Sequence, residues 1–393
     1  MNSPFQDPDF LRDPYPTYEA LRRNGAVQKL PGTGHKAGYV VTGYSEAKQA
    51  LADPGLSKDT KRFFAGKETG RSLHSAVSQN MLATDPPDHT RLRRLITKAF
   101  TPGAVDRLRP YIVDLADELL ESWMPGDQVD IIESLAIPLP VTVICQLLGI
   151  PPADRDRVRA WSRDLFAAGA PQRIDTASHA LAEYMSELVS SKRRTPDDAL
   201  LSALVAVRDS DGDQLTEQEL VSLAVLLLVA GHETTTAAIG NAVLALLRHP
   251  GQLELLRSDP NRIESAVDEL LRYDSAVTIA TWRWAPEPIR VGETDIPADS
   301  PVFVSPGAAN RDPARFADPD RLDLGREEAR AHLAFGHGIH RCLGAPLAHA
   351  EVATAVRMLL AHFPNLRLAE PADQLRWRHS RLVRGLESLP VLL

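Results

Sequence analysis

One segment constrains the fold of this chain more than any other: a helical pattern that runs from Thr216 to Arg248. It opens on Thr216-Glu-Gln-Glu219, which is a capping box, and His249-Pro250 ends it. A helix of these 33 residues is about 50 Å long, the diameter of a whole domain. We therefore expect this helix to pass through the centre of the protein.

The middle of this helix carries residues that helices and apolar cores both disfavour. It reads Ala230-Gly-His-Glu-Thr-Thr-Thr236, and a glycine and three threonines are poor helix-interior residues. Threonine hydroxyls can bond the carbonyl four residues back and bend the helix, so a polar patch at a solvated turn is one interpretation. The apolar sequences on both sides favour a functional one, because a buried carboxylate is costly.

The composition of the 393 residues is that of an ordinary globular protein, with 44% hydrophobic and 24% charged residues. This excludes disordered, fibrous and disulfide-scaffold classes. A net charge of -8 does not attract nucleic acid or anionic lipid. The two cysteines, Cys145 and Cys342, cannot build a disulfide framework, which fits a reducing cytoplasm. No secretory signal opens the chain, and the longest apolar stretch, Leu220 to Gly231, is about half of what a membrane span needs.

Helical periodicity recurs along most of the chain, with short β-type runs between. Residues 27–41 read as a hairpin around a Gly-rich turn, 289–291 and 302–304 as short strands, and 307–341 as irregular chain. We expect one mostly α domain over residues 1–393 with small β-sheets. The predicted helices are 45–52, 89–99, 103–123, 138–148, 153–168, 174–194, 197–208, 216–248, 250–257, 261–273 and 343–361.

The segment from Phe335 to Gly344, FGHGIHRCLG, is the strongest chemical signal. Its three glycines indicate a tight turn where backbone approaches something closely. Cys342 lies at the start of the next helix beside Arg341, and both features favour a thiolate. Cys145, inside VICQLLG, reads instead as core packing. A zinc site of His337, His340 and Cys342 is an alternative, although it lacks a fourth ligand and a usual spacing.

This loop resembles the haem-binding loop of cytochrome P450 monooxygenases, whose pattern is F-x-x-G-x-H-x-C-x-G. The resemblance implies the mainly α cytochrome P450 fold, with haem b (iron protoporphyrin IX) between the long central helix and the helix after the loop. It makes Cys342 the iron ligand, His340 a partner of a haem propionate and Phe335 a further cofactor contact.

The central helix is similar to the same family's [A/G]-G-x-[D/E]-T-[T/S] motif. By that match, Glu233 and Thr234 form an acid–alcohol pair that delivers protons for oxygen activation, and Ala230 and Gly231 leave space beside the iron. Relatives that use peroxide often lack the pair, so its presence argues against that specialisation.

Two further segments fit the family pattern. Glu269-x-x-Arg272 alone is an ordinary helix pair, but the family uses it as a buried brace, for which Arg321 is the candidate third member.

The second segment is Asp85-Pro-Pro-Asp-His-Thr-Arg-Leu-Arg93, where His89 and Arg93 lie four apart on one helix face and suit an anion. The resemblance makes that anion a haem propionate, with Arg283 as a second arginine. The other basic residues of this helix read as a solvated face or as a docking surface for an acidic redox partner: Arg91, Arg94 and Lys98.

The resemblance implies a cytoplasmic, monomeric monooxygenase that uses O2 and electrons from ferredoxin and ferredoxin reductase, with no nucleic-acid or membrane partner. The expected reaction is hydroxylation or epoxidation of a mainly apolar polyketide or macrolide, steroid or terpenoid in secondary metabolism. The alternative is a non-catalytic haem-binding sensor or carrier, which needs no acid–alcohol pair. The expected pocket wall is apolar and consists of Leu226, Val229, Ala230, Ile279 and Val383. Core packing without ligand contact is the alternative for these five residues, above all for Val383.

Overall fold

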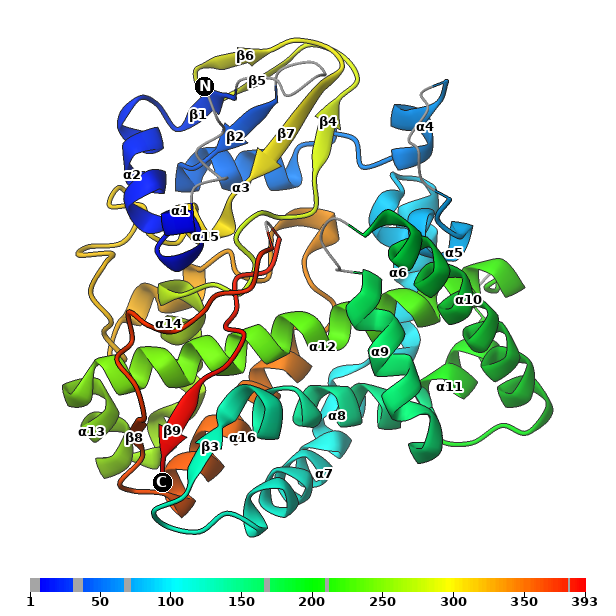
Figure 1. Ribbon diagram of the computed structural model, residues 1–393. Helices are drawn as coiled ribbons and strands as arrows, with labels where there is room; N and C mark the ends of the chain where they lie inside the picture. The colour runs from blue at the N-terminus through cyan, green and yellow to red at the C-terminus, as the bar shows by residue number, and fades with distance from the viewer. Residues whose placement is uncertain (1–7, 31–37, 67–71, 166–169, 209–211, 381) are drawn as a thin grey trace. The chain divides into compact units, whose positions relative to one another are not determined.

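Helices dominate the computed structural model, which describes residues 8–30, 38–66, 72–165, 170–208, 212–380 and 382–393 (Figure 1). The predicted mainly α class is confirmed. Contacts divide the chain into unit 1, residues 1–57, 112–138 and 234–393, and unit 2, residues 58–111 and 139–233. The single domain expected over residues 1–393 stays a prediction.

Unit 1 holds the sheets and the helices of the C-terminal half. Its helices are α1 (Pro8–Arg12), α2 (Tyr15–Arg23), α3 (Tyr44–Ala52), η3 (Ile132–Ala136), α13 (Pro250–Ser258), η5 (Pro260–Arg262), α14 (Ile263–Tyr273), α15 (Pro306–Ala309), η6 (Glu327–Ala331), η7 (Gly338–His340) and α16 (Ala345–His362). Its strands are β1 (Val27–Lys29), β2 (Tyr39–Val41), β3 (Gln128–Asp130), β4 (Arg283–Ala285), β5 (Ile289–Val291), β6 (Thr294–Ile296), β7 (Ser300–Val304), β8 (Arg367–Leu368) and β9 (Pro390–Leu392).

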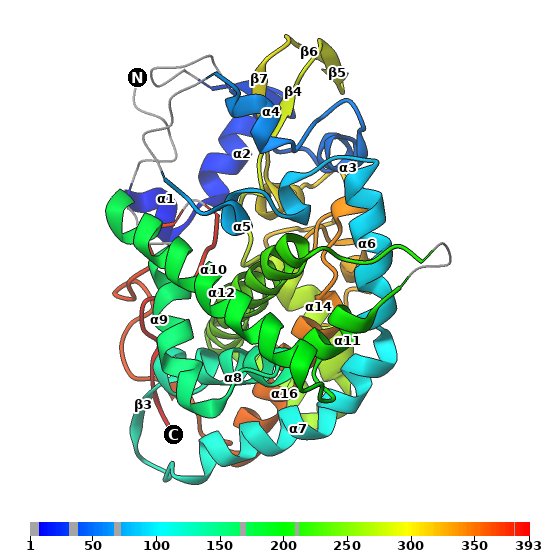
Figure 2. The same ribbon diagram turned by 90° about the vertical axis from the view of Figure 1, so that its right-hand side faces the viewer.

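Unit 2 is helical in the part of it that the structure describes. It contains α4 (Thr60–Phe64), α5 (Ser75–Ser78), η2 (Met81–Ala83), α6 (Asp88–Ala99), η4 (Pro152–Asp154), α9 (Arg155–Leu165), α10 (Pro171–Arg194) and α11 (Leu200–Ala206). In Figure 2, α10 packs along α9 and also contacts α11 and α5. Three helices have residues in both units: α7 (Pro102–Glu121), α8 (Pro138–Leu148) and α12 (Glu217–Arg248).

The long helix α12 begins with the predicted capping box. The Thr216 N–H donates to Glu219 Oε2 at 2.8 Å, and the Glu219 N–H donates to Thr216 Oγ1 at 3.3 Å. By length and composition alone α12 could cross a membrane, but 67% of its most apolar window is buried inside the protein. Burial of that kind is typical of a core helix, as the sequence predicts.

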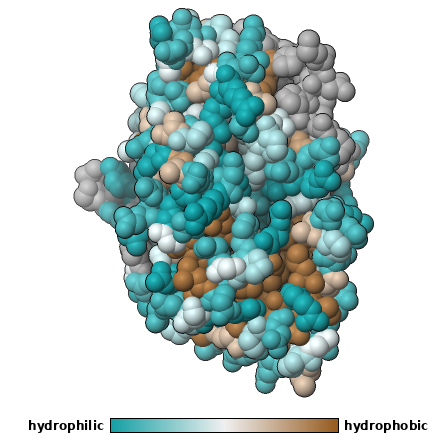
Figure 3. Space-filling view, turned by 90° about the vertical axis from the view of Figure 1, so that its left-hand side faces the viewer, coloured by the Kyte–Doolittle hydropathy of each residue, from teal (hydrophilic) through white to brown (hydrophobic). Residues whose placement is uncertain are grey.

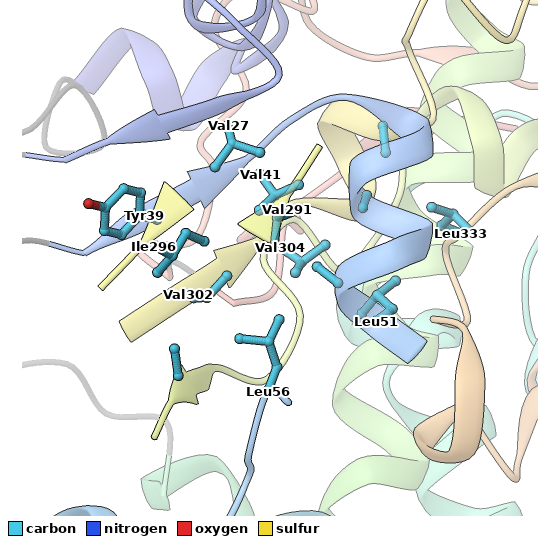
Figure 4. Close-up of a cluster of buried hydrophobic side chains, with 14 residues drawn as sticks. Val27, Tyr39, Val41, Leu51, Leu56, Val291, Ile296, Val302, Val304 and Leu333 are labelled. Atoms are coloured by element: carbon cyan, nitrogen blue, oxygen red, sulfur yellow. The ribbon is translucent and has the colours of Figure 1, made fainter. Parts of the chain in front are cut away.

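The predicted hairpin is confirmed and forms one edge of a four-stranded sheet, in the order β1-β2-β7-β4. Val27 pairs with Val41 in antiparallel register, and β2 then pairs in parallel with β7. The hairpin's Gly-rich turn and residues 166–168 of a predicted helix lie outside the described residues. Figure 4 shows the apolar cluster between this sheet and α3, with Val41 and Val304 on the strands, Leu51 on α3 and Leu333 at the edge of the cluster beside that helix.

Polar residues predominate on the one face of the surface that Figure 3 shows. On the face shown in Figure 3, hydrophilic side chains cover most of the area and hydrophobic ones gather in the lower half. Elsewhere the structure adds short elements that the sequence pattern did not predict, such as α1, α2, β3 and β8. α1, β3 and β8 have two to five residues, too few for hydrophobic periodicity to identify, whereas α2 has nine and was missed although it is as long as the predicted α3.

Candidate functional site

The cysteine loop of unit 1 ends where α16 begins. Cys342 is exposed, and its N–H donates to the Phe335 carbonyl at 2.8 Å, which closes the loop. Gly344 is the N-cap residue of α16. The thiol thus lies at the positive end of an 18-residue helix, where negative charge is stabilised.

Two of the three glycines make the tight turn that the sequence predicts. Gly336 and Gly338 have φ of 71° and 73°, in the left-handed region that favours glycine. A Cβ on Gly338 would lie 2.8 Å from the Leu51 carbonyl oxygen of α3. Gly344 has φ of -80°, so its conformation needs no glycine.

The other predicted residues of unit 1 lie in the same loop and on β4. His340 and Phe335 are half-buried. Burial lowers the pKa of His337, and the charges of Lys48 and Arg341 lower it further. Arg283 is 4% exposed, and its Nη1 donates to the Thr281 carbonyl at 3.1 Å.

The buried brace on α14 is present, with one correction. Glu269 and Arg272 are both fully buried and form two hydrogen bonds of 2.6 and 2.8 Å. The third member is Arg326, whose Nε lies 3.2 Å from Glu269 Oε1, so the prediction of Arg321 was wrong. Arg321 is exposed, and it offers its carbonyl oxygen to Arg272 at 3.3 Å because the turn that starts at Asp318 carries its backbone there.

In unit 2, helix α6 carries the predicted anion-binding face. His89 is 1% exposed and Arg93 is half-buried one turn later. Burial, followed by the charges of Arg93 and Lys58, lowers the pKa of His89, while Asp85 acts in the opposite direction. Lys58 is itself 3% exposed. Two cations, Lys58 and Arg93, thus lie near the buried His89 and are only partly offset by Asp85, an arrangement that favours an anion.

Of the other basic residues of α6, Arg91 forms ion pairs with Asp213, at 3.1 Å, and with Glu219. Lys98 donates to the Arg208 carbonyl at 3.1 Å. Arg91 and Lys98 thus make contacts within unit 2, and Arg94 and Lys98 are both exposed.

One face of α12 is left uncovered near the middle of the helix. Ala230 is exposed, and Leu226 and Thr234, one turn to either side, are half-buried, although most of the helix is buried. Gly231 has another role than the predicted one: a Cβ there would meet Ile144 of α8 at 2.9 Å, so this glycine permits close helix packing. Ala230 stays the predicted space-giving residue of the motif.

The acid of the predicted pair is buried and the alcohol is half-buried. Glu233 is 6% exposed, and its Oε1 lies 3.7 Å from Nε2 of His232. His232 Nδ1 lies 2.8 Å from the Leu228 carbonyl, which fixes the ring against the helix. A carboxyl group and a hydroxyl are the group types that a proton source and a relay require, so Glu233 and Thr234 stay the candidates for these roles.

These residues fit a haem. The exposed thiol at a helix start is a suitable axial ligand, the buried basic groups suit propionates, and the apolar face at Ala230 suits a bound organic molecule. The zinc alternative gains no support, since the described residues contain no group of three or more His, Cys, Asp or Glu that could hold a metal ion.

Comparison with known proteins decides the family. The cytochrome P450 family model matches residues 160–376. The chain is 45% identical to cytochrome P450 107B1 of Saccharopolyspora erythraea, over 98% of this chain and 96% of that protein. This chain is a cytochrome P450. It also superposes on the tirandamycin C-bound P450 monooxygenase TamI, with a TM-score of 0.89, 46% identity and coverage of 98% and 99%.

A third P450 extends the structural agreement to the whole chain. The bacillaene polyketide synthase cytochrome P450 PksS of Bacillus subtilis has a TM-score of 0.92 and 36% identity, with each chain fully covered. The predicted P450 fold, the haem b cofactor and the monooxygenase class are thereby confirmed. A non-catalytic haem sensor or carrier is not supported.

The residues predicted from the sequence divide between the units of this P450. Unit 1 carries Thr234, Arg283, Phe335, His340 and Cys342. Unit 2 carries His89, Arg93, Ala230 and Glu233.

Sequence reasoning missed Lys58 and Arg326. Lys58 stands in a loop without periodicity, and only its burial beside His89 singles it out. Arg326 lies outside the motif match, in irregular chain. Cys145 was predicted correctly as core packing: it is fully buried, and burial raises its pKa to about 11.

Unit 2 also encloses a polar cavity of about 380 Å³ between α4, α6 and the start of α12. Asp59, Asp88 and Glu219 contribute carboxylates to its wall. Leu223 of α12 lies at its apolar side, one turn before Leu226.

Proposed function

We propose that this P450 hydroxylates or epoxidises a mainly apolar natural product, a polyketide or macrolide first and a steroid or terpenoid second, in secondary metabolism. The observation that carries the proposal is the uncovered face of α12, where Leu226 and Ala230 precede Thr234 at helical spacing. An apolar wall binds hydrocarbon by burial, at about 25 cal/mol per Å². The PksS similarity supports a polyketide as the first class to test.

Further apolar contacts of the substrate are proposed at Val229 of unit 2, which is half-buried, and in unit 1 at Ile279, which is half-buried, and Val383, which is 6% exposed. Leu223, one turn before Leu226 on α12, also lines the polar cavity of unit 2, together with carboxylates and hydroxyls. We therefore propose that this cavity receives the polar end of the substrate, such as a hydroxyl or a sugar.

The cofactor's residues follow from the site. Cys342 would ligate the haem iron through its sulfur, His340, His89, Arg93 and Arg283 would hold the propionates, and Phe335 would contact the cofactor. Haem with a thiolate ligand supplies the reductive activation of O2 that the reaction needs. The protein supplies binding, orientation and protons.

Proton delivery is the role proposed for Glu233 and Thr234. The carboxyl group of Glu233 takes up a proton, and the Thr234 hydroxyl passes it on from the uncovered face of the helix.

Electrons are proposed to come from a ferredoxin and its reductase. Around the cysteine loop, Lys48 and Arg341 are exposed, and Ile339 is 52% exposed. An apolar residue among cations suits an acidic partner, which the charges would steer. We further propose that the chain acts as a cytoplasmic monomer without nucleic-acid or membrane partners.

The test is a spectral binding screen with macrolides and other polyketides, steroids, terpenes and fatty acids, followed by turnover with NADPH, ferredoxin and reductase. A spin-state shift and an oxygenated product with a polyketide support the proposal. A saturating shift with fatty acids alone, or binding without any oxygenated product, contradicts it.

A further inference from the structure

A buried arginine near the end of the chain is anchored on its first helix. The side chain of Arg384 is 7% exposed. Its Nη1 donates to the Leu11 carbonyl at 2.6 Å and its Nη2 to the Arg12 carbonyl at 3.0 Å. These two residues end α1, where a helix leaves its carbonyls without partners inside the helix. Arg384 therefore ties the C-terminal part of unit 1 to α1, although 372 positions separate it from Arg12.

The remaining guanidinium nitrogen of Arg384 binds a largely buried carboxylate. Nε donates to Asp274 Oδ1 at 2.7 Å, and the Tyr15 hydroxyl of α2 donates to the same oxygen at 2.7 Å. Burial, followed by the charge of Asp274, raises the pKa of Tyr15, so the phenol keeps the proton that it donates. The guanidinium also lies 3.6 Å from the ring centre of Trp377. Because its fork of donors is planar and rigid, these contacts together fix one orientation of Arg384.

The backbone of Arg384 belongs to two segments that pair with each other. Residues 276–278 and 382–384 lie in antiparallel register, and we refer to them as the paired segments. The Arg384 N–H donates to the Ala276 carbonyl at 2.7 Å. On the other side, Asn241 of α12 donates through Nδ2 to the Arg384 carbonyl at 3.0 Å. Arg384 thus links the paired segments to α1, α2 and α12 at once.

The paired segments carry apolar side chains that the protein does not fully cover. Leu382 is 42% exposed, and Val277 and Ile279, directly after the first segment, are half-buried. Val277 lies opposite Val383, so these two share one face of the pair, and Arg384 lies on the other face. Uncovered apolar side chains suit contact with an apolar ligand. The anchored arginine and these apolar residues therefore belong to one element.

We propose that Arg384 is a positioning residue for the substrate: held by Asp274, Tyr15 and the last carbonyls of α1, it fixes the paired segments against which the apolar part of the substrate rests. The inference rests on the proposed function, in which Ile279 and Val383 contact the substrate. Arg384 acts through these neighbours, because its own guanidinium nitrogens are all engaged elsewhere. Helices α1 and α2 thereby take part in substrate specificity.

Two variants of the holoenzyme test the anchor from its two sides. Arg384→Lys keeps the positive charge but offers one nitrogen in place of three, so it cannot hold Asp274 and both α1 carbonyls in the same geometry. Tyr15→Phe keeps the ring and removes only the hydrogen bond from α2 to Asp274.

The matched control is Arg22→Lys, on α2 of the same unit. Arg22 donates through Nη1 and Nη2 to the carbonyls of Ala308 and Arg311, at 3.1 Å each, and its Nε lies 3.8 Å from Asp312. It is thus another largely buried arginine that holds two carbonyls and an aspartate. None of these three partners belongs to the paired segments.

The probes are imidazole and 4-phenylimidazole, titrated into the holoenzyme and followed by the red shift of the Soret band when their nitrogen binds the iron. Imidazole alone reports access to the iron, whereas the phenyl ring adds burial against the pocket wall. The ratio of the two dissociation constants is insensitive to a loss of haem or of overall stability, which a merely structural role would cause.

We expect Arg384→Lys to weaken the binding of 4-phenylimidazole several-fold and to leave that of imidazole unchanged. Tyr15→Phe should shift the ratio in the same direction by less, and Arg22→Lys should match wild type. A wild-type ratio in Arg384→Lys, or an equal shift in Arg22→Lys, would overturn the proposal.

Ile279→Ala and Val383→Ala separate this inference from the proposed function. If they change the ratio and Arg384→Lys does not, the substrate contacts stand and the anchor is refuted. If neither changes the ratio, the proposed contacts are refuted and the inference is refuted with them. If Arg384→Lys fails to hold haem, Tyr15→Phe decides: a changed ratio supports the anchor, and a wild-type ratio refutes it.

Discussion

Removing the carboxylate of Glu269 should destabilise the whole protein and not one chemical step. Glu269 is fully buried and accepts four hydrogen bonds: from Arg272 Nε at 2.6 Å and Nη2 at 2.8 Å, from the Asp323 N–H at 3.0 Å and from Arg326 Nε at 3.2 Å. Glu269→Ala leaves two largely buried guanidinium groups without their shared anion. Breaking a buried pair in this way costs about 3–5 kcal/mol.

That loss is a large part of the roughly 5–15 kcal/mol by which proteins are stable. At about 2–3 kcal/mol per M of urea, the unfolding midpoint falls by about 1 M or more. The assay is urea unfolding followed by circular dichroism, together with haem content per protein. Glu269→Gln keeps the shape and loses the charge, so its midpoint should fall between those of Glu269→Ala and wild type.

The matched control is Glu264→Ala on the same helix. Its side chain is 47% exposed and pairs with Arg357 at 3.2 Å, an arrangement worth about 0–1 kcal/mol. A midpoint for Glu269→Ala no lower than that of Glu264→Ala, with normal haem content, would refute the buried brace.

Three further substitutions probe the central helix and the cysteine loop. Thr234→Ala should keep haem but divert electrons into peroxide, which lowers the amount of product formed per NADPH consumed. The control Thr236→Ala, at a position only 5% exposed, should leave that ratio unchanged. Equal ratios in both variants would show that Thr234 serves only in helix packing. Ala230→Leu should change regioselectivity and the substrate-induced spin shift, because this position is exposed in mid-helix; unaltered values would place the substrate elsewhere. Gly338→Ala should lower the melting temperature and haem retention more than Gly336→Ala does. Both glycines have positive φ, but only at Gly338 would an added Cβ meet the α3 backbone. Equal losses in the two variants would argue against that contact.

The features that the sequence predicted are those set by nearby residues. The capping box of α12 needs only Thr216 and Glu219, three positions apart, and both of its hydrogen bonds are present. The tight turn at Gly336 and Gly338 likewise follows from two residues that tolerate positive φ. Such patterns require no knowledge of what packs against them.

The features that it missed depend on distant contacts. Arg326 and not Arg321 completes the brace because the path of an irregular loop is set by where its carbonyls bind, here on Arg272. A side chain at position 231 would collide with Ile144, which lies on another helix, so the need for glycine there depends on a distant contact. Nothing near Lys58 in the sequence indicates that it is buried beside His89, because burial is a property of the folded protein.

The most direct test of the account is the spectrum of the reduced protein with carbon monoxide, recorded for wild type, Cys342→Ser and Cys145→Ala. If Cys342 is the thiolate ligand, wild type and Cys145→Ala show the strongly red-shifted Soret band of thiolate ligation, and Cys342→Ser loses it together with NADPH-driven oxygenation. A wild-type band at the position of neutral histidine ligation, or a red-shifted band that persists in Cys342→Ser, would contradict the account.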